Sequence, residues 1–360
     1  MVILTRLRLA NLRLFEQLEL DLVAGWNLFF GGNGAGKTTI LEAACLLSHG
    51  RSFRTGSHEA LARSGSAGYA IYGDIETEGA VRGVGIARRN GRLEARLGGQ
   101  AVAVGELMRH TAVLCFEPGS HELLAGGSEG RRRFLDWGVF HVEHEFLPAW
   151  SRYQRALRQR NVLLRLDAAD AELAPWNQEL ARSGEPLTRM RQRYFAVLAQ
   201  AALPLLEELL PELGQAQLSL SAGHDPNRPL QEELVERQAR DRERGHSTRG
   251  PHRADWSLAF ERAPSREHWS RGQDKLAAFA LLMAQAQCHA ASHGGRMPVL
   301  CLDDVASEID QAHRARVFDM VGRSGAQVLV TATDQSALPA THEGRVAMFH
   351  VEQAGVHRLL

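Results

Sequence analysis

Short runs of alternating hydrophobic and polar residues between residues 3 and 30 predict antiparallel strands, because successive side chains of a strand point to opposite faces. They lead into the apolar run Asn27 to Phe30, which indicates a buried strand. A glycine-rich segment follows, and residues 38–48 then place apolar side chains on one face of a helix that Gly50 is expected to end. The predicted order is strand, glycine loop, helix.

Further along the chain the pattern changes twice. Glycine-punctuated strands are predicted between residues 69 and 100 and at 112–116, and long helical patterns follow, such as Trp150 to Leu166 and Pro186 to Leu210. After residue 270, helices and apolar strands alternate in the rhythm of a parallel sheet. We therefore predict an α/β fold in which residues 1–118 and 262–360 form a mixed-sheet lobe and residues 119–261 form an inserted, helical second lobe.

Composition narrows the class of protein. The 360 residues are 44% hydrophobic, and Lys plus Arg equals Asp plus Glu at 42 each, so only local patches could attract nucleic acid. The four cysteines occur singly, which argues against a zinc site or a disulfide framework. No apolar run is long enough to span a bilayer and no signal peptide is evident, so we expect a cytoplasmic protein without a membrane partner.

The segment GGNGAGKT at 31–38 matches the phosphate-binding P-loop pattern and has the required strand before it and helix after it. Glycines let backbone N–H groups surround phosphate oxygens, while Lys37 reaches the terminal phosphates and the Thr38 hydroxyl can bind Mg²⁺. Lysine is rare in this chain, since only Lys37 and Lys275 occur among its basic residues. The predicted ligands of ATP in this segment are Gly31, Gly32, Asn33, Gly34, Ala35, Gly36, Lys37, Thr38 and Thr39.

Two carboxylates follow the apolar strand that ends at Leu302. We expect Asp303 to hold Mg²⁺ through water, together with Thr38, and Asp304 to polarise the attacking water as general base. A pair of acids at a strand end is equally typical of a solvated turn. Its occurrence in the same chain as a P-loop favours the catalytic interpretation, with Asp304 and Lys37 as catalytic residues.

The segment Ser270-Arg271-Gly272-Gln273 begins a predicted helix just before that strand and looks like the S-G-G-Q signature of ABC ATPases, with Arg for the first Gly. A capped amphipathic helix is the alternative interpretation. In ABC ATPases the signature of one subunit approaches the nucleotide of the other. Ser270, Gly272 and Gln273 are therefore candidate ATP ligands in a homodimer that forms on ATP binding.

Together these segments resemble the RecF family, ATPases of bacterial recombination and repair that are related to SMC proteins. The resemblance extends over the chain, through GRSFRT at 50–55, RGPHR at 249–253, SRGQDK at 270–275 and LCLDDVASEID at 300–310. It implies an ABC-type head that binds ATP, Mg²⁺ and single- or double-stranded DNA at gap junctions. It also implies RecO and RecR as partners that help RecA to assemble.

The resemblance assigns further residues and leaves alternatives open. Arg54 resembles an arginine near the nucleotide of SMC-type heads, and Glu308 and Asp310 resemble a loop that touches the opposing head. ABC ATPases usually carry Glu as general base; Asp304 is one methylene shorter, so slow turnover is expected. The alternatives are a transporter ATPase subunit, disfavoured because Thr333 stands where transporters carry His, and a DNA-binding module that does not hydrolyse ATP.

Local arginine clusters are the candidates for DNA contact, since arginine neutralises backbone phosphates without reading sequence. The alternative is a solvated charged face, because acids are interleaved with some of these arginines. The clusters are Arg131 to Arg133, the helix with Arg152, Arg155, Arg158 and Arg160, and the stretch Arg237 to Arg253.

Overall fold

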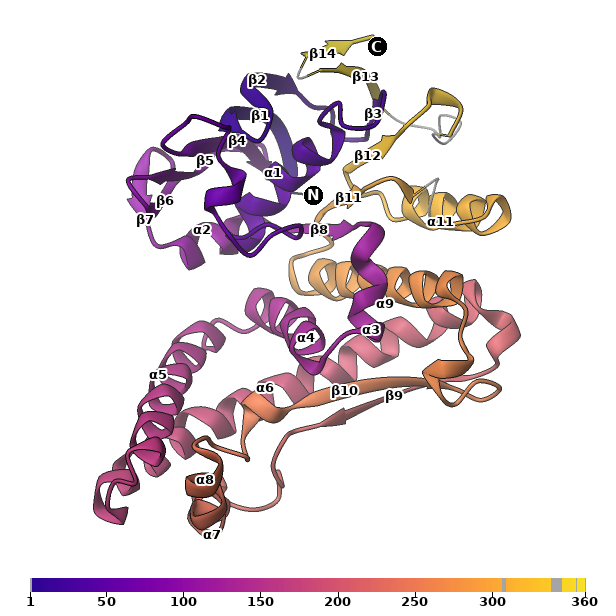
Figure 1. Ribbon diagram of the computed structural model, residues 1–360. Helices are drawn as coiled ribbons and strands as arrows, with labels where there is room; N and C mark the ends of the chain where they lie inside the picture. Colours follow the sequence, from indigo (N-terminus) through magenta and orange to yellow (C-terminus); the bar gives the residue numbers. More distant parts are fainter. Residues whose placement is uncertain (1, 306–308, 338–344, 354, 360) are drawn as a thin grey trace. The chain divides into compact units, whose positions relative to one another are not determined.

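The structure, a computed structural model, describes all residues except 1, 306–308, 338–344, 354 and 360. It divides into two units (Figure 1). The first combines residues 1–120 with 271–360, and the second comprises residues 121–270. The junctions between units thus follow residues 120 and 270, whereas the predicted lobe boundaries follow residues 118 and 261.

One sheet of the first unit is antiparallel, in the order β2-β1-β4-β5-β6-β7. Its strands are β1 Ile3–Leu12, β2 Phe15–Asp21, β4 Tyr69–Thr77, β5 Ala80–Arg89, β6 Arg92–Leu97 and β7 Gln100–Val102. Two-residue turns at 78–79, 90–91 and 98–99 join the last four strands. Both residues of each turn have positive φ, the backbone of a type I′ turn, whose twist matches that of the flanking strands. The glycine punctuation in the sequence therefore marks hairpins.

The second sheet holds the parallel strands and has the order β14-β13-β3-β12-β11-β8. Its strands are β3 Trp26–Phe30, β8 Val113–Phe116, β11 Val299–Leu302, β12 Val328–Ala332, β13 Val346–Glu352 and β14 Gly355–Arg358. All neighbours are parallel except β14, which pairs antiparallel with β13. Strands β11 and β12 are buried along their whole length, as expected for sequences that are apolar throughout in β11 and apolar except for Thr331 in β12.

Helix α1 (Lys37–His49) packs between these sheets and shares one hydrophobic core with both. It begins after Gly36 and ends at Gly50, whose φ of 63° is left-handed and whose N–H donates to the Leu46 carbonyl at 2.9 Å. The predicted strand–loop–helix order is confirmed. The other α-helices described in this unit are α2 Val104–His110, α9 Arg271–Ser292 and α11 Gln311–Arg323.

The second unit is built around two long helices, α5 (Phe146–Arg165) and α6 (Asp170–Leu209), which a short loop joins into an antiparallel pair (Figure 1). The smaller helices are α3 Glu122–Ala125, α4 Ser128–Val142, α7 Leu230–Glu236 and α8 Gln238–Arg244. The helical pattern predicted from Pro186 to Leu210 is confirmed as part of α6, but the structure differs from the prediction in two respects. Helix α6 begins well before Pro186 and runs through it, and the unit also contains two antiparallel strands, β9 (Ala216–Ser221) and β10 (Asp255–Phe260).

Both differences have physical causes. Proline inside a helix removes one backbone hydrogen bond, but the residues that follow Pro186 include Leu187 and Tyr194, whose burial offsets that loss. The two strands are far apart in the sequence, so no local turn signal announces that they pair. Across the part of the chain that the structure describes, no helix has the length and hydrophobicity needed to cross a membrane.

Candidate nucleotide-binding site

The glycine loop between β3 and α1 adopts a backbone that only glycine tolerates at two positions. Gly31 has a φ of 150°, and a Cβ there would lie 2.1 Å from the Val351 carbonyl oxygen. Gly36 has a φ of 114°, and a Cβ there would lie 2.7 Å from the Phe15 ring. Side chains are therefore excluded from both ends of the loop. This fixes the path of the backbone just before the N-terminus of α1, where its N–H groups can bind an anion.

The other predicted loop ligands divide into a tip and a base. Gly32, Asn33 and Gly34 are exposed at the tip. Ala35 and Thr39 are buried at the base, and their N–H groups donate to the carbonyls of Gly32 at 3.3 Å and Gly36 at 3.0 Å. The exposed tip leaves the backbone accessible to a ligand, while the base anchors it to the helix.

Lys37 lies beneath this loop, and only 8% of its surface is exposed. Its ammonium Nζ donates to the carbonyl oxygens of Gly31 at 2.7 Å and Gly32 at 2.9 Å. Burial lowers the pKa of Lys37, and the negative charges of Asp304 and Asp303 partly oppose that shift. A compact ammonium with three donors suits this position, which is consistent with one of the chain's two lysines standing here.

Asp303 connects helix α1, which follows the glycine loop, to strand β12 of the parallel sheet through hydrogen bonds. Its Oδ1 accepts hydrogen bonds from the hydroxyl of Thr38 at 3.0 Å and from the hydroxyl of Thr331 at 2.7 Å. Thr38 is in α1, Asp303 follows β11, and Thr331 is in β12. Because the carboxyl ends of parallel strands meet at one edge, residues far apart in the sequence are brought together beside the glycine loop.

Burial raises the pKa of Asp303, since only 4% of the residue is exposed; the hydrogen bonds from Thr331 and Thr38 lower it, and the nearby Asp304 raises it further. A buried carboxylate beside a hydroxyl is an oxygen donor set that suits Mg²⁺. A cation bound there would also favour the ionised form that burial disfavours. The donor chemistry of Thr38 and Asp303 therefore fits the predicted metal.

Asp304 has a strained backbone, with a φ of 50° in the left-handed region. Such a conformation costs a residue other than glycine roughly 1–2 kcal/mol and is often retained at functional sites. Its N–H donates to the Thr331 hydroxyl oxygen at 2.9 Å, so one hydroxyl contacts both acidic residues. Thr331 was not among the predicted site residues. The available signal was one polar residue inside the fully buried strand β12.

Arg54 lies close enough to Asp303 for its positive charge to counteract the raised pKa of that carboxyl. Its side chain is 47% exposed, and its Nη1 is 3.9 Å from a carboxylate oxygen of Glu42. The structure thus brings five predicted site residues of the first unit to one edge of the sheet. They are Lys37, Thr38, Arg54, Asp303 and Asp304.

The signature-like segment lies at the start of α9. Ser270 directly precedes that helix and is exposed, and Gly272 and Gln273 lie in its first turn, where Gly272 is exposed. Asp310 caps α11, accepting from the N–H groups of Ala312 at 3.0 Å and His313 at 3.1 Å, so it has a structural role in this chain. Glu308, predicted to touch an opposing head, lies outside the described residues.

Comparison with known proteins identifies the family. The family profile described as RecF/RecN/SMC N terminal domain matches residues 3–356. A DNA replication and repair protein RecF from Stenotrophomonas maltophilia (strain R551-3) is 45% identical over 360 residues, which cover 98% of each chain. The chain belongs to the RecF family. The predicted resemblance is confirmed, and membership of this family argues against the transporter alternative.

Solved structures confirm the fold of the RecF-family chain. A structure of the recombination mediator protein RecF with ATP, in the RecFOR pathway, covers 100% of this chain and 98% of its own, with a TM-score of 0.89 and 25% identity. The Smc head domain from Pyrococcus furiosus, bound to the C-terminal domain of ScpA, matches with a TM-score of 0.59 and 14% identity. The α/β, ABC-type ATPase head that the sequence predicted is therefore observed.

Proposed function

We propose that this chain is an ATP-dependent DNA-binding protein of recombinational repair and replication that hydrolyses ATP slowly. The observation that carries the proposal is the hydroxyl–carboxylate chain Thr38–Asp303–Thr331 beside the glycine loop. It joins the predicted Mg²⁺ ligands to the strand edge from which Asp304 extends. The names of the relatives, which describe replication, repair and recombination, supply the cellular role.

In this proposal the loop backbone and Lys37 bind the phosphates of ATP, and Thr38 with Asp303 holds Mg²⁺. When bound, Mg²⁺ would neutralise negative charge on the terminal phosphates. The Lys37 ammonium now donates hydrogen bonds to the carbonyls of Gly31 and Gly32. When ATP binds, the ammonium would exchange these carbonyls for phosphate oxygens. Burial of the ammonium strengthens its attraction to an anion.

Asp304 is proposed to orient the attacking water and accept its proton. Its carboxylate is held by a short side chain on a strained backbone, so its reach is restricted and turnover is slow. Asp304→Asn should retain ATP binding and lower the single-turnover hydrolysis rate by about 100-fold, a typical contribution of a general base. If wild type and Asp304→Asn bind ATP equally and neither hydrolyses it, the non-hydrolysing alternative replaces this proposal.

The arginines predicted to contact DNA fall into two groups. Several are held inside the second unit: Arg131 pairs with Asp255 at 2.7 Å, and Arg160 is fully buried and pairs with Asp241 at 2.7 Å. Arg160 was therefore a wrong candidate, since it cannot reach a phosphate. Arg242 likewise pairs with Asp167 and with Asp170.

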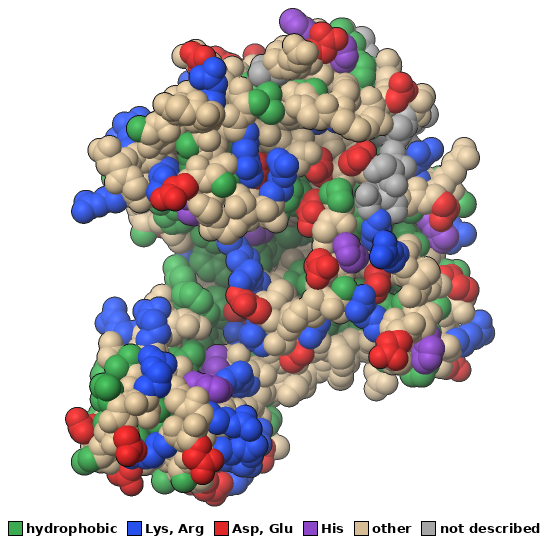
Figure 2. All heavy atoms as spheres, in the orientation of Figure 1, with side chains coloured by type: hydrophobic (Ala, Val, Ile, Leu, Met, Phe, Trp, Pro, Cys, Tyr) green, Lys and Arg blue, Asp and Glu red, His purple; other side chains and the backbone are tan. Residues whose placement is uncertain are grey.

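The outer face of α5 retains the strongest case for contact with DNA. Arg152, Arg155 and Arg158 are exposed there and form no ion pair with the described residues. The helix sequence, FLPAWSRYQRALRQRNVLLR, contains no acidic residue. Figure 2 shows basic and acidic side chains interspersed over the visible surface, so an acid-free basic face is a local exception. We propose that backbone phosphates of single- or double-stranded DNA bind along it.

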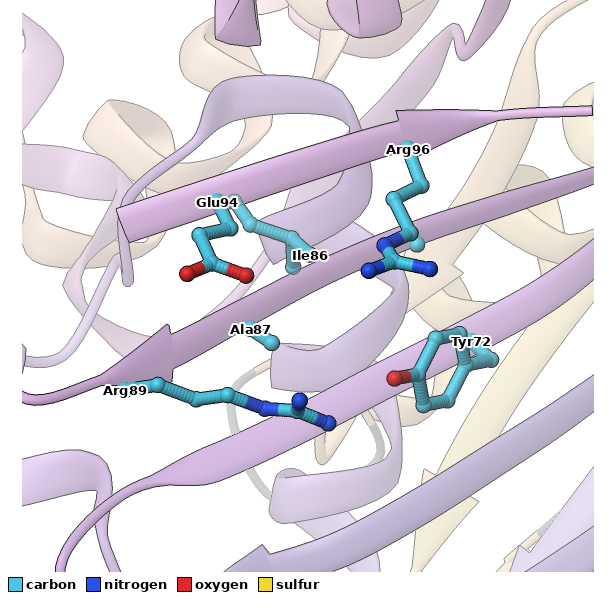
Figure 3. Close-up of a pocket in the computed structure, with 7 residues that line it drawn as sticks. Tyr72, Ile86, Ala87, Arg89, Glu94 and Arg96 are labelled. Atoms are coloured by element: carbon cyan, nitrogen blue, oxygen red, sulfur yellow. The ribbon is translucent and has the colours of Figure 1, made fainter. Parts of the chain in front are cut away.

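A second arginine-bearing surface lies on the outer face of the antiparallel sheet. A surface hollow there is lined by Tyr72, Arg89, Glu94 and Arg96 (Figure 3). Arg89 faces Arg92 across the strands, and such like-charged pairs destabilise a sheet slightly. Glu94 lowers the net positive charge of this hollow, so its attraction for phosphate should be weaker than that of α5. We therefore propose the hollow only as a secondary contact for DNA phosphates.

The test of the DNA proposal combines Arg155→Ala with Arg158→Ala. Loss of two phosphate contacts should lower affinity for duplex and single-stranded DNA alike and reduce the slope of log K against log salt by roughly 2. Arg228→Ala is the matched control, because this arginine of the same unit already pairs with Glu236 at 2.6 Å. Equal DNA affinities and salt slopes for the double variant and wild type would exclude α5 as the interface.

We also propose a homodimer in which ATP is bound between the P-loop of one copy and Ser270, Gly272 and Gln273 of the other. The exposure of Ser270 and Gly272 leaves the start of α9 accessible to a second copy. RecO- and RecR-type mediators are proposed as further partners, because a structural relative is described as part of the RecFOR pathway.

A further inference from the structure

Glu42 is a fully buried carboxylate close to the nucleotide site. It lies one helical turn after Thr38 on α1, and none of its surface is exposed. Its two oxygens accept hydrogen bonds from Nε of Arg13 at 3.0 Å and from Nη2 of Arg13 at 2.8 Å. The hydroxyl of Ser52 also donates to it. A charge this deeply buried must be compensated, and Arg13 supplies the compensation.

These contacts tie the loop after α1 to the helix itself. The Ser52 hydroxyl oxygen accepts the backbone N–H of Arg54 at 2.9 Å and that of Thr55 at 3.2 Å. Arg13 holds the far end of the loop, because its Nη1 donates to the Ala60 carbonyl at 2.8 Å. Arg13 does so from a left-handed backbone, with a φ of 54°. Ser52 thus contacts the Glu42 carboxylate directly, and Ala60 is connected to the same carboxylate through Arg13.

The same hydrogen bonds determine how closely the Arg54 guanidinium approaches Glu42. Arg13 occupies both oxygens of Glu42, and Arg54 approaches the carboxylate only to 3.9 Å. One negative charge therefore faces two guanidinium groups, which leaves a net positive charge at this position. The Arg54 side chain is 47% exposed, and its positive charge lowers the pKa of Asp303, the proposed metal ligand.

We infer that Glu42 and Ser52 are positioning residues that hold Arg54 toward the terminal phosphate of ATP. The inference rests on the proposed function, since it requires ATP at the glycine loop. The carboxylate attracts Arg54 without binding it bidentately, and Ser52 fixes the backbone from which Arg54 extends. A guanidinium held in this way can stabilise negative charge on the phosphate without first being reordered.

Substitution of Glu42 would leave Arg13, which is only 22% exposed, without its anionic partner and could prevent folding, so Ser52 carries the test. Ser52→Ala should lower the single-turnover rate of ATP hydrolysis roughly tenfold, the effect of losing one charge-assisted contact. Ser52→Thr retains the hydroxyl and should restore the rate. Ser57→Ala is the control: it removes another hydroxyl of the same loop, one that accepts only the Glu59 N–H, and should match wild type.

The decisive comparison is made in an Arg54→Ala background. If Ser52 acts through Arg54, Ser52→Ala will cause no further loss there, because the group that it positions is already absent. A further tenfold loss in that background, or a wild-type rate for Ser52→Ala alone, would overturn the inference. Wild-type protein that binds ATP but shows no hydrolysis would instead overturn the proposed function, and this inference with it.

Discussion

At the scale of single residues, the hydroxyl of Thr331 contacts both acidic residues of the candidate site, the proposed metal ligand Asp303 and the proposed general base Asp304. It donates to Oδ1 of Asp303 and accepts the N–H of Asp304, so it sets the orientation of one carboxylate and the backbone of the next. The residue is 1% exposed, so water does not substitute for it easily. Thr331 is therefore a positioning residue of the site rather than a group that reacts.

Thr331→Val keeps the size of the side chain and removes the hydroxyl. We expect the single-turnover rate of ATP hydrolysis to fall about 10- to 100-fold, which corresponds to loss of a hydrogen bond to a charged group. The affinity for ATP should change less, because the loop and Lys37 remain in place. Thr331→Ser, which retains the hydroxyl and loses the methyl group, is the control. Equal rates for Val and Ser at this position would refute the assignment.

The sequence alone predicted the site residues that belong to motifs. Lys37 and Thr38 follow from the glycine loop, and Asp303 follows from an apolar strand that ends in acids. Thr331 and Glu42 could not be predicted in the same way, because each depends on contacts between segments far apart in the chain. Thr331 lies 28 residues from Asp303, and only strand pairing in the sheet brings the two together.

At the scale of elements, helix α5 carries arginines on two faces, one buried and one exposed. Arg160 is buried against α6 and α8, where it donates to Asn177 at 2.6 Å and to both Asp241 and Ser247 at 2.7 Å. Arg155, on the same helix, points to solvent. The difference follows from helical spacing, which the sequence pattern contains but a count of arginines ignores.

Arg160→Met tests this division. The substitution leaves the carboxylate of Asp241 buried without a cation, and we expect the free energy of unfolding to fall by about 3–5 kcal/mol. The measurement is the urea midpoint followed by circular dichroism. Gln159→Ala, one residue away and exposed, should change the free energy of unfolding by less than about 0.5 kcal/mol. A stability equal to wild type for Arg160→Met would show that the buried network contributes nothing.

Elements were predictable where their pattern was local. Helix α1 was expected at residues 38–48, within one residue of its observed ends, and β11 was expected to end at Leu302, as it does, since a glycine cap and an apolar run define them. The pairing of β9 with β10 was not predictable, because helices α7 and α8 both lie between the two strands in the sequence. The C-terminal part of α6 was predicted as a helical pattern from Pro186 to Leu210, whereas the helix itself begins at Asp170.

At the scale of the whole molecule, the numbers of acidic and basic residues are equal, so the proposed DNA binding would depend on where arginines lie and on how many copies bind together. A dimer doubles the available phosphate contacts, and ATP would control it if the nucleotide is bound between two copies. ATP binding would then be coupled to DNA affinity by mass action, without a change of fold in either unit.

The most direct test is the mass of the protein in solution, measured by light scattering with and without ATP·Mg²⁺. If ATP is bound between two copies, we expect ATP to double the mass of wild type. Ser270→Arg should bind ATP and remain monomeric, because arginine would obstruct the start of α9, while Lys37→Met should remain monomeric because it no longer binds ATP. Wild type that binds ATP and stays monomeric, or Lys37→Met that dimerises with ATP, would rule out the proposed ATP-dependent dimer.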